Sequence, residues 1–221
     1  MIVKHAADSH ARIKRLTKFV VPGLMGLTLV LGVAFGAVSA APPPSPQQLQ
    51  NVLQQDGAGY PSVVARVNGR PLSGKELAQR VAVVQQSQAL GAAKADPVQT
   101  ALDQMIEEAV LIDAAGQRGI AISEDEARAS AQMHVQRTTA MPGGKELIAT
   151  YAADLGVTPD RYAADSRVVA AYQQGMILGE MRAQLADTLP AARRGDPAAV
   201  QAAVKSFVAQ SGANVEVLIA R

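Results

Sequence analysis

The 221-residue sequence contains no cysteine and no tryptophan, and aromatic residues make up only 3% of it. The absence of cysteine excludes disulfides, thiolate metal sites, a cysteine nucleophile and a lipid-modified cysteine. The scarcity of aromatics leaves few side chains on which nucleic-acid bases could stack. Because 48% of the residues are hydrophobic, the chain can still form a core, and wholesale disorder is excluded.

Positive charge is concentrated at the N-terminus. Residues 1–18 hold five lysines and arginines and one aspartate, a sum of +4, whereas the whole chain carries +2, so residues 19–221 sum to −2. Nucleic-acid binding needs a basic face on the folded part of a protein. We therefore expect no nucleic-acid partner, and we interpret residues 1–18 as a basic cytoplasmic leader.

An uncharged apolar run occupies residues 19–41. About 20 apolar residues suffice to span a bilayer as a helix, so this run is predicted to be a transmembrane anchor or a signal peptide. Cations precede it and none follows directly, which places the rest of the chain outside the cytoplasm. The small residues Val38, Ser39 and Ala40 suit cleavage after Ala40, whereas the length of the run favours a retained anchor. The sequence leaves both alternatives open.

Two localisations follow from these alternatives. A retained anchor makes the protein a single-pass protein of the bacterial cell envelope, in contact with the cytoplasmic membrane through residues 19–41. Cleavage makes it periplasmic or secreted. Residues 42–59, rich in proline and glutamine, are predicted to be an extended linker, and residues 60–221 to be the folded domain.

Two short strands frame the predicted domain. Residues 63–67 form a β-branched run that ends in Asn68-Gly69, a hairpin-turn signal, and residues 215–219 form a second run. A lone strand leaves its backbone groups unpaired. We therefore predict that residues 63–67 pair with residues 215–219 in a small sheet.

About six helices lie between the strands. Capping boxes begin two of them, at Ser73 and Ser123, and a capping residue followed by proline begins three others. Apolar residues recur at three- and four-residue spacing within them. The expected helices cover residues 73–88, 97–118, 123–138, 145–155, 158–185 and 197–211. The fold class is mostly α, with one helix of about 28 residues.

The order of these segments resembles the N-terminal chaperone domain of SurA-like proteins. The resemblance rests on VARVNG at residues 64–69, on IEEAVLIDAAGQRGIAIS at residues 106–123, and on the later helices and final strand. It covers residues 60–221. It implies that the helices form a cradle that binds unfolded polypeptide, as in the similar arm domain of trigger factor.

One departure from that family limits what the resemblance implies. SurA-like proteins usually carry one or two parvulin-type prolyl isomerase domains between the long helix and the C-terminal one. Only residues 186–195 stand there in this chain, and a parvulin domain needs roughly a hundred residues. We therefore expect no isomerase activity.

Residues typical of catalysis are scarce in residues 60–221. His134 is the single histidine there, no nucleophile motif accompanies it, and we interpret it as a half-exposed helix residue. No ligand set for a metal or for another cofactor is recognised. We expect neither an enzyme nor a cofactor.

Flexible side chains are the positive signal for binding. Methionine adapts to many apolar partners, so Met133, Met141 and Met181, with Tyr172 nearby, are the predicted residues of a substrate-binding groove. The sequence thus predicts an ATP-independent holdase for unfolded or nascent exported polypeptides. The alternative is an envelope assembly protein that binds one specific partner. The oligomeric state stays open, a homodimer included.

Overall fold

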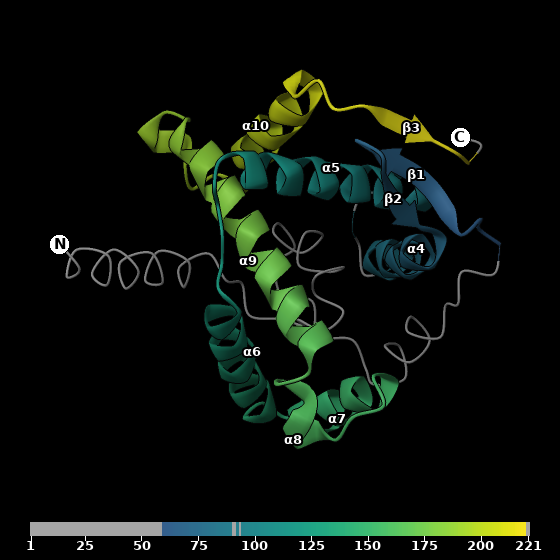
Figure 1. Ribbon diagram of the computed structural model, residues 1–221, viewed down its shortest axis with the longest axis vertical. Helices are drawn as coiled ribbons and strands as arrows, with labels where there is room; N and C mark the ends of the chain where they lie inside the picture. Colours follow the sequence, from purple (N-terminus) through teal and green to yellow (C-terminus); the bar gives the residue numbers. More distant parts are fainter. Residues whose placement is uncertain (1–58, 90–91, 93, 220–221) are drawn as a thin grey trace.

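The structure, a computed structural model, describes residues 59–89, 92 and 94–219 (Figure 1). Helices dominate it, and a small antiparallel sheet lies at one end. In chain order the elements are β1 (Val63–Val67), β2 (Arg70–Ser73), α4 (Gly74–Ala89), α5 (Pro97–Gln117), α6 (Glu124–Thr139), α7 (Gly144–Asp154), α8 (Pro159–Tyr162), α9 (Ser166–Asp187), η1 (Ala191–Arg193), α10 (Pro197–Gln210) and β3 (Val215–Val217). The predicted leader and apolar run, and residues 42–58 of the predicted linker, lie outside the described residues.

The sheet joins the first and last strands of the described chain. Its order is β2-β1-β3, and Ala65 stands opposite Val217 in an antiparallel register. The pairing extends past β3, because the backbone N–H of Leu218 donates to the carbonyl of Val64 at 2.9 Å. The predicted pairing of residues 63–67 with the C-terminal run is confirmed.

Strand β2 was not predicted, since it follows the Asn68-Gly69 turn for only four residues and contains Pro71. Asn68 and Gly69 have φ values of 50° and 81°, as a tight hairpin turn requires. Proline is tolerated because β2 is an edge strand, where its missing N–H interrupts no ladder. Only Leu72 of this strand is buried, so no alternating pattern marked it.

The starts of α5 and α6 follow the predicted capping chemistry, whereas Thr158, at the start of α8, makes no capping hydrogen bond with its side chain. The carboxylate of Asp96 accepts hydrogen bonds from the backbone N–H groups of Val98 and Gln99, at 2.8 and 3.0 Å, ahead of α5. Ser123 and Glu126 form a complete capping box ahead of α6. These contacts satisfy N–H groups that have no partner inside the helix, which explains why both boundaries are sharp.

The long helix predicted over residues 158–185 is wrong, because the structure has two helices there. Thr158-Pro159 begins only α8, and the chain turns before α9 starts at Ser166. Asp165 interrupts the helix, because its backbone is extended and its side chain accepts a hydrogen bond from the backbone N–H of Arg167 at 3.0 Å. A short carboxylate that caps a new helix competes with continuation of the old one. Helix α9 is therefore roughly 33 Å long, at 1.5 Å per residue.

The buried side chains form three groups, and α5 and α9 connect them. The first group, the sheet core, lies between the sheet, α4 and the first half of α5. The second lies where the ends of α5 and α9 meet α10. The third lies between α6, α7, α8 and the start of α9, with Val83 of α4. We call this third group the tyrosine core; it contains Tyr151, Tyr162 and Tyr172.

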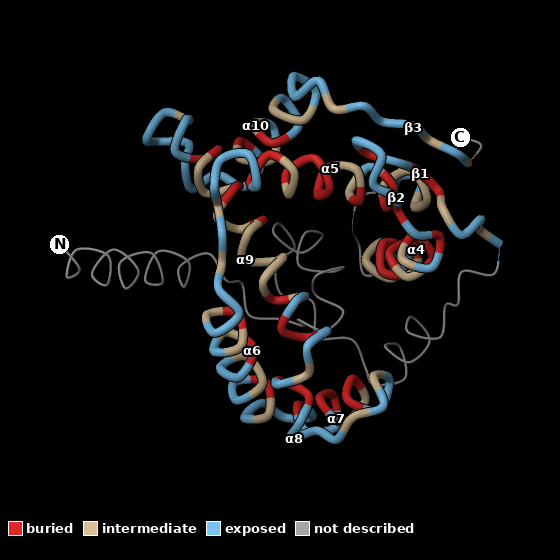
Figure 2. The backbone as a smooth tube through the Cα atoms, viewed as in Figure 1, coloured by how far each residue is buried: buried red, intermediate tan, exposed pale blue. Residues whose placement is uncertain are grey.

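Helices α5 and α9 span the molecule in different directions (Figure 1). Helix α5 runs beneath α10, and α9 descends from α10 toward α7 and α8 at the opposite end. Buried segments of α4, α5 and α7 face inward, as Figure 2 shows. In the described part of the chain, no helix combines the length and the apolar character needed to cross a bilayer.

Deleting residues 213–221 tests the pairing of the two ends. The deletion removes β3 and the contacts of Val217 and Ile219 with the sheet core. We expect the free energy of unfolding to fall by about 2 kcal/mol or more, because that apolar area is returned to water. Urea unfolding measures it. In the control Leu218→Ser, which changes an exposed side chain, the thermal midpoint stays within about 2 °C.

Candidate functional site

The four predicted groove residues do not share one surface. Met133, on α6, and Met141, just after it, are exposed, at 37% and 46%. Tyr172 and Met181, both on α9, are buried, at 1% and 0%. They belong to two different cores, Tyr172 to the tyrosine core and Met181 to the group around α10. Spacing along a single helix could not show which of its sides the neighbouring helices cover.

Met181 is held in the interior by two neighbours of different kinds. Its sulfur lies 3.7 Å from a guanidinium nitrogen of Arg118, which donates to it. The same guanidinium stacks over the ring of Phe207 on α10, 5.0 Å from its centroid. Apolar residues of α5 and α10 complete the surroundings. Met181 therefore connects α9 to the end of α5 and serves packing rather than an open groove.

Tyr172 lies among buried aromatic groups. Its ring centroid is 6.1 Å from that of His134 on α6. The rings of Tyr151, on α7, and Tyr162, on α8, stack with centroids 6.1 Å apart. Each helix of this region therefore contributes one aromatic ring to the tyrosine core.

The hydroxyls of Tyr151, Tyr162 and Tyr172 are buried and have no hydrogen-bond partner among the residues that the structure describes. Burial raises the pKa of each phenol well above its ordinary value, so all three stay protonated. An unpaired buried hydroxyl costs about 1–3 kcal/mol relative to one that water or protein satisfies. The tyrosine core is therefore less stable than its apolar contacts alone suggest.

His134 is half-buried on α6, as predicted. Its Nε2 shares a hydrogen bond with the hydroxyl of Thr138 at 3.2 Å. Burial lowers the pKa of His134, and the nearby positive charge of Arg137 lowers it further. The imidazole is therefore neutral in the folded domain at neutral pH. Among the described residues, the hydroxyl that it contacts is that of Thr138, which is only 3% exposed and so out of reach of a substrate.

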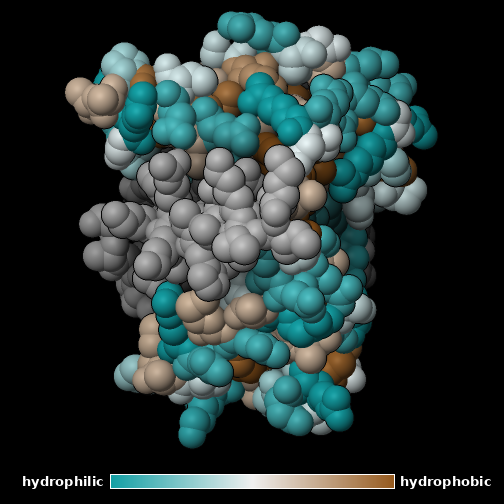
Figure 3. All heavy atoms as spheres, turned by 60° about the vertical axis from the view of Figure 1, so that its left-hand side comes forward, coloured by the Kyte–Doolittle hydropathy of each residue, from teal (hydrophilic) through white to brown (hydrophobic). Residues whose placement is uncertain are grey.

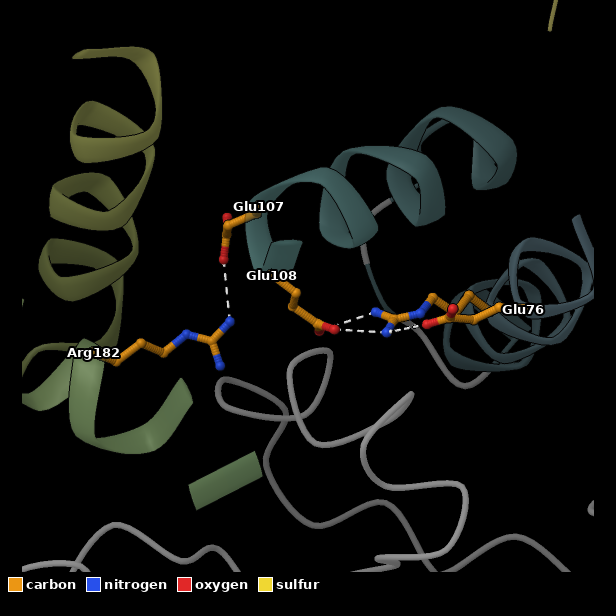
Figure 4. A network of polar contacts seen from close by, with 5 residues as sticks. Glu76, Glu107, Glu108 and Arg182 are labelled. Carbon is orange, nitrogen blue, oxygen red and sulfur yellow. Dashed lines mark hydrogen bonds and ion pairs between the residues drawn. The ribbon is translucent and has the colours of Figure 1, made fainter. Parts of the chain in front are cut away.

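A buried ion network that the sequence reasoning missed joins α4 to α5 (Figure 4). The guanidinium of Arg80 donates to both carboxylate oxygens of Glu108, at 2.9 and 2.6 Å. Arg80 and Glu108 are only 2% and 3% exposed. A further bond from Arg80 reaches Glu76 at 2.8 Å. One guanidinium thus lies between two carboxylates.

The neighbouring residue Glu107 makes a second, separate set of contacts. One of its oxygens accepts from Arg182 of α9 at 3.2 Å, and the other accepts from the side-chain amide of Gln201 of α10 at 2.8 Å. Figure 4 shows Glu107 pointing toward Arg182, away from Glu108 and Glu76. Adjacent glutamates on α5 therefore hold α4 on one side and α9 with α10 on the other.

The two buried charges, on Arg80 and Glu108, neutralise each other, while Glu76 is 40% exposed to solvent, so the network serves structure. Burial raises the pKa of Glu108, and the paired guanidinium of Arg80 opposes that change. Breaking such a pair leaves an uncompensated buried charge, which is strongly destabilising. The available signal was Glu107-Glu108 inside an otherwise apolar helical stretch, a pattern that requires buried partners. Elsewhere in the described residues, no group of three potential metal ligands gathers.

Exposed apolar surface is scarce among the described residues. Besides Met133 and Met141, the exposed large apolar side chains are Val215 and Leu218, at the opposite end of the molecule. On the face turned forward in Figure 3, hydrophobic residues surface in small separate groups between hydrophilic ones. The described atoms of that face form no broad apolar patch.

Comparison with family models matches residues 27–140 to the SurA-like N-terminal domain. The match covers just over half of the 221 residues. The chain belongs to this family. The family indicates a chaperone-type role. Searches of curated proteins and of solved structures found no match to the chain.

The matched part of this SurA-like chain begins within the predicted apolar run and ends with α6. It therefore contains the β1–β2 hairpin, α4 and α5, including Arg80, Glu107 and Glu108. Between α9 and α10 the chain has only residues 188–196, with the short helix η1. No parvulin domain is inserted at this point.

Glu108→Gln tests the structural role of the buried pair. Because Arg80 would keep its charge in the interior without a full partner, we expect the free energy of unfolding to fall by about 3–5 kcal/mol. Urea denaturation measures the change. Glu124→Gln is the matched control, since Glu124 pairs with Arg128 at the surface, and there the loss should stay within about 1 kcal/mol. Equal losses would contradict the assignment.

Acidification should weaken the domain through His134. Its folded pKa lies below the ordinary value of 6.5, so the unfolded chain binds the proton more readily. The stabilisation is therefore complete above pH 6.5 and is lost as the pH falls through the folded pKa. We expect the thermal midpoint to drop between pH 7.5 and 5.5, and to drop less in His134→Gln. Identical profiles for the two proteins would refute the effect.

Proposed function

We propose that this SurA-like chain is an ATP-independent holdase for unfolded exported polypeptides, without prolyl isomerase activity. The family membership carries the proposal, because it indicates a chaperone-type role. The cradle expected of the helices is part of the same proposal. The alternative expectation, an assembly protein with one partner, has no observation of its own in its favour.

The chemistry of the described residues favours binding over catalysis. The buried carboxylates of α5 are engaged by Arg80, Arg182 and Gln201, and so are not free to transfer protons. The hydroxyl bonded to His134 belongs to Thr138, which is buried and so cannot reach a substrate. Catalysis by an acid, base or nucleophile needs such a group within reach of a substrate. The proposal therefore assigns no catalytic residue.

Met133 and Met141 are the surface residues that we assign to client contact. They lie on α6 and directly after it, and their thioethers can follow apolar side chains of varied shape. Only glycine fits at position 144, where α7 begins, because a Cβ there would lie 1.7 Å from the Thr138 carbonyl oxygen. The methionines thus lie beside a turn in which the end of α6 and the start of α7 approach each other closely. Tyr172 and Met181 are buried, so we do not assign them to client contact at the surface.

The mechanism requires no nucleotide. Binding an unfolded chain lowers the concentration that is free to aggregate, by mass action alone. The location remains a proposal too: residues 19–41 would hold the domain at the outer face of the cytoplasmic membrane, or cleavage after Ala40 would release it. In both cases the domain would meet polypeptides as they emerge from the cytoplasm.

Aggregation of a thermally unfolding client tests the proposal. The full chain in lipid nanodiscs should suppress light scattering at severalfold molar excess, with no effect of added ATP and no acceleration of prolyl isomerisation. Empty nanodiscs are the control. Met133→Gln with Met141→Gln should weaken suppression about twofold to threefold, since only part of the apolar contact is removed. An absence of suppression, with tight capture of one defined partner instead, would favour the assembly protein.

A further inference from the structure

We propose that α7 and α8 form a flap that opens transiently, and that the tyrosine core, buried between the inner face of this flap and the rest of the domain, is the surface that captures an extended apolar polypeptide. The flap is defined as residues 144–162. The second half of this proposal rests on the proposed holdase function, whereas the opening itself does not. Three observations support it: the placement of the flap, its unpaired hydroxyls and the scarcity of exposed apolar surface.

The flap is attached to the rest of the domain through few elements. The main packing partners of α7 are α6 and α8, and that of α8 is α7. Figure 1 places both helices at the end of the molecule opposite to the sheet. Turns bound the flap on both sides, one at residues 140–143, where Gly143 has a φ of 73°, and one at residues 163–165. The flap is also held by a hydrogen bond from the Arg167 guanidinium of α9 to the Leu155 carbonyl, at 2.8 Å, but this bond is exposed and water can replace it. The two helices of the flap can therefore move as a unit about these two turns.

The inner face of the flap is apolar but contains unsatisfied polar atoms. Helix α7 buries Leu147, Ile148, Tyr151 and Ala152, and α8 buries Tyr162. The hydroxyls of Tyr151 and Tyr162, like that of Tyr172 on α9, lack a partner when the flap is closed. Opening hydrates them, so the closed state is stabilised less than an all-apolar interface of this size would be. The minor open state is thereby raised in population.

The exposed core would fit one kind of ligand. An extended polypeptide offers apolar side chains together with unpaired backbone carbonyls. Tyrosine rings pack against the former, and their hydroxyls donate to the latter. The hydroxyls that are orphaned in the closed state would then gain partners in the complex. Such a ligand shifts the equilibrium toward the open state, because it binds only that state.

The scarcity of apolar side chains on the surface of the domain also supports a binding surface that is hidden in the closed state. Only four large apolar side chains are exposed among the described residues, and they are divided between two ends of the molecule. That surface is small for the capture of an unfolded chain. The largest aromatic group of the domain, three of the four tyrosines in the chain, is buried instead where the inner face of the flap, with Tyr151 and Tyr162, meets Tyr172 of α9.

The absence of cysteine allows a direct test of opening by thiol labelling. Ala152→Cys places a single thiol in the fully buried inner face of α7, and Ala115→Cys places one at an equally buried position of α5. Under native conditions we expect the thiol at residue 152 to react about tenfold faster or more. If either variant fails to fold, Ile148→Cys and Val110→Cys replace the pair. Equal rates at the two positions overturn the flap, whatever the client experiments give.

Tyrosine-to-phenylalanine variants then test the role of the hydroxyls. Tyr151→Phe with Tyr162→Phe removes two buried polar atoms and keeps both rings. We expect labelling at residue 152 to slow about fivefold or more, since the closed state is relieved of unpaired hydroxyls. Tyr60→Phe, at the edge of the sheet core, is the matched control and should leave the rate unchanged. An unchanged or faster rate in the double variant contradicts the mechanism.

Suppression of aggregation tests the captured ligand. The double phenylalanine variant, in the full chain, should lose suppression about threefold or more while its thermal midpoint rises or holds. A variant that opens more slowly yet suppresses as well as the parent overturns the tyrosine core as the capture surface. If the parent chain itself suppresses nothing, the holdase function fails, and the labelling rates still decide whether the flap opens.

Discussion

The domain depends on one guanidinium buried between two helices. Arg80 cannot lie in the interior unless Glu108 is opposite it, and this requirement fixes how α4 crosses α5. Glu107, one residue away, fixes α9 and α10 on the other side of α5. Apolar contacts supply most of the stabilisation, but they would tolerate small rotations of the helices. The charged contacts would not, because a displaced charge loses its partner while remaining out of water.

The two ends of the molecule differ in how far their buried polar groups are satisfied by hydrogen bonds. Around α5, the buried carboxylates are paired and helices are tied in several directions, and only the Nε of Arg80 lacks a partner among the described residues. Around α7 and α8, three buried hydroxyls have no partner among the described residues, and the closest helix packing is that of α7 with its neighbours α6 and α8. A chaperone needs a constant scaffold and a surface that can change, and this uneven satisfaction of polar groups provides both within a single small domain.

Local chemistry made most element boundaries predictable. Asp96-Pro97 and the Ser123/Glu126 box act within four residues, so sequence alone located the starts of α5 and α6. The end-to-end pairing followed from the need to satisfy two isolated strands. Prediction was wrong where two local signals competed, as at Asp165, which caps α9 inside an otherwise helical stretch. The site was harder, because the burial of Tyr172 and Met181 and the partnership of Arg80 with Glu108 depend on which helices meet in space.

The strand order β2-β1-β3 also constrains when the domain can form. A ribosome makes the chain from its N-terminus, so β1 and β2 exist long before β3. Until residues 215–217 appear, β1 has an open edge, and the side of the sheet core that Val217 covers is exposed. The hairpin must remain unpaired on that side while every intervening helix is synthesised. Completion of the fold is therefore tied to the last residues of the domain, which makes its folding a late event relative to synthesis.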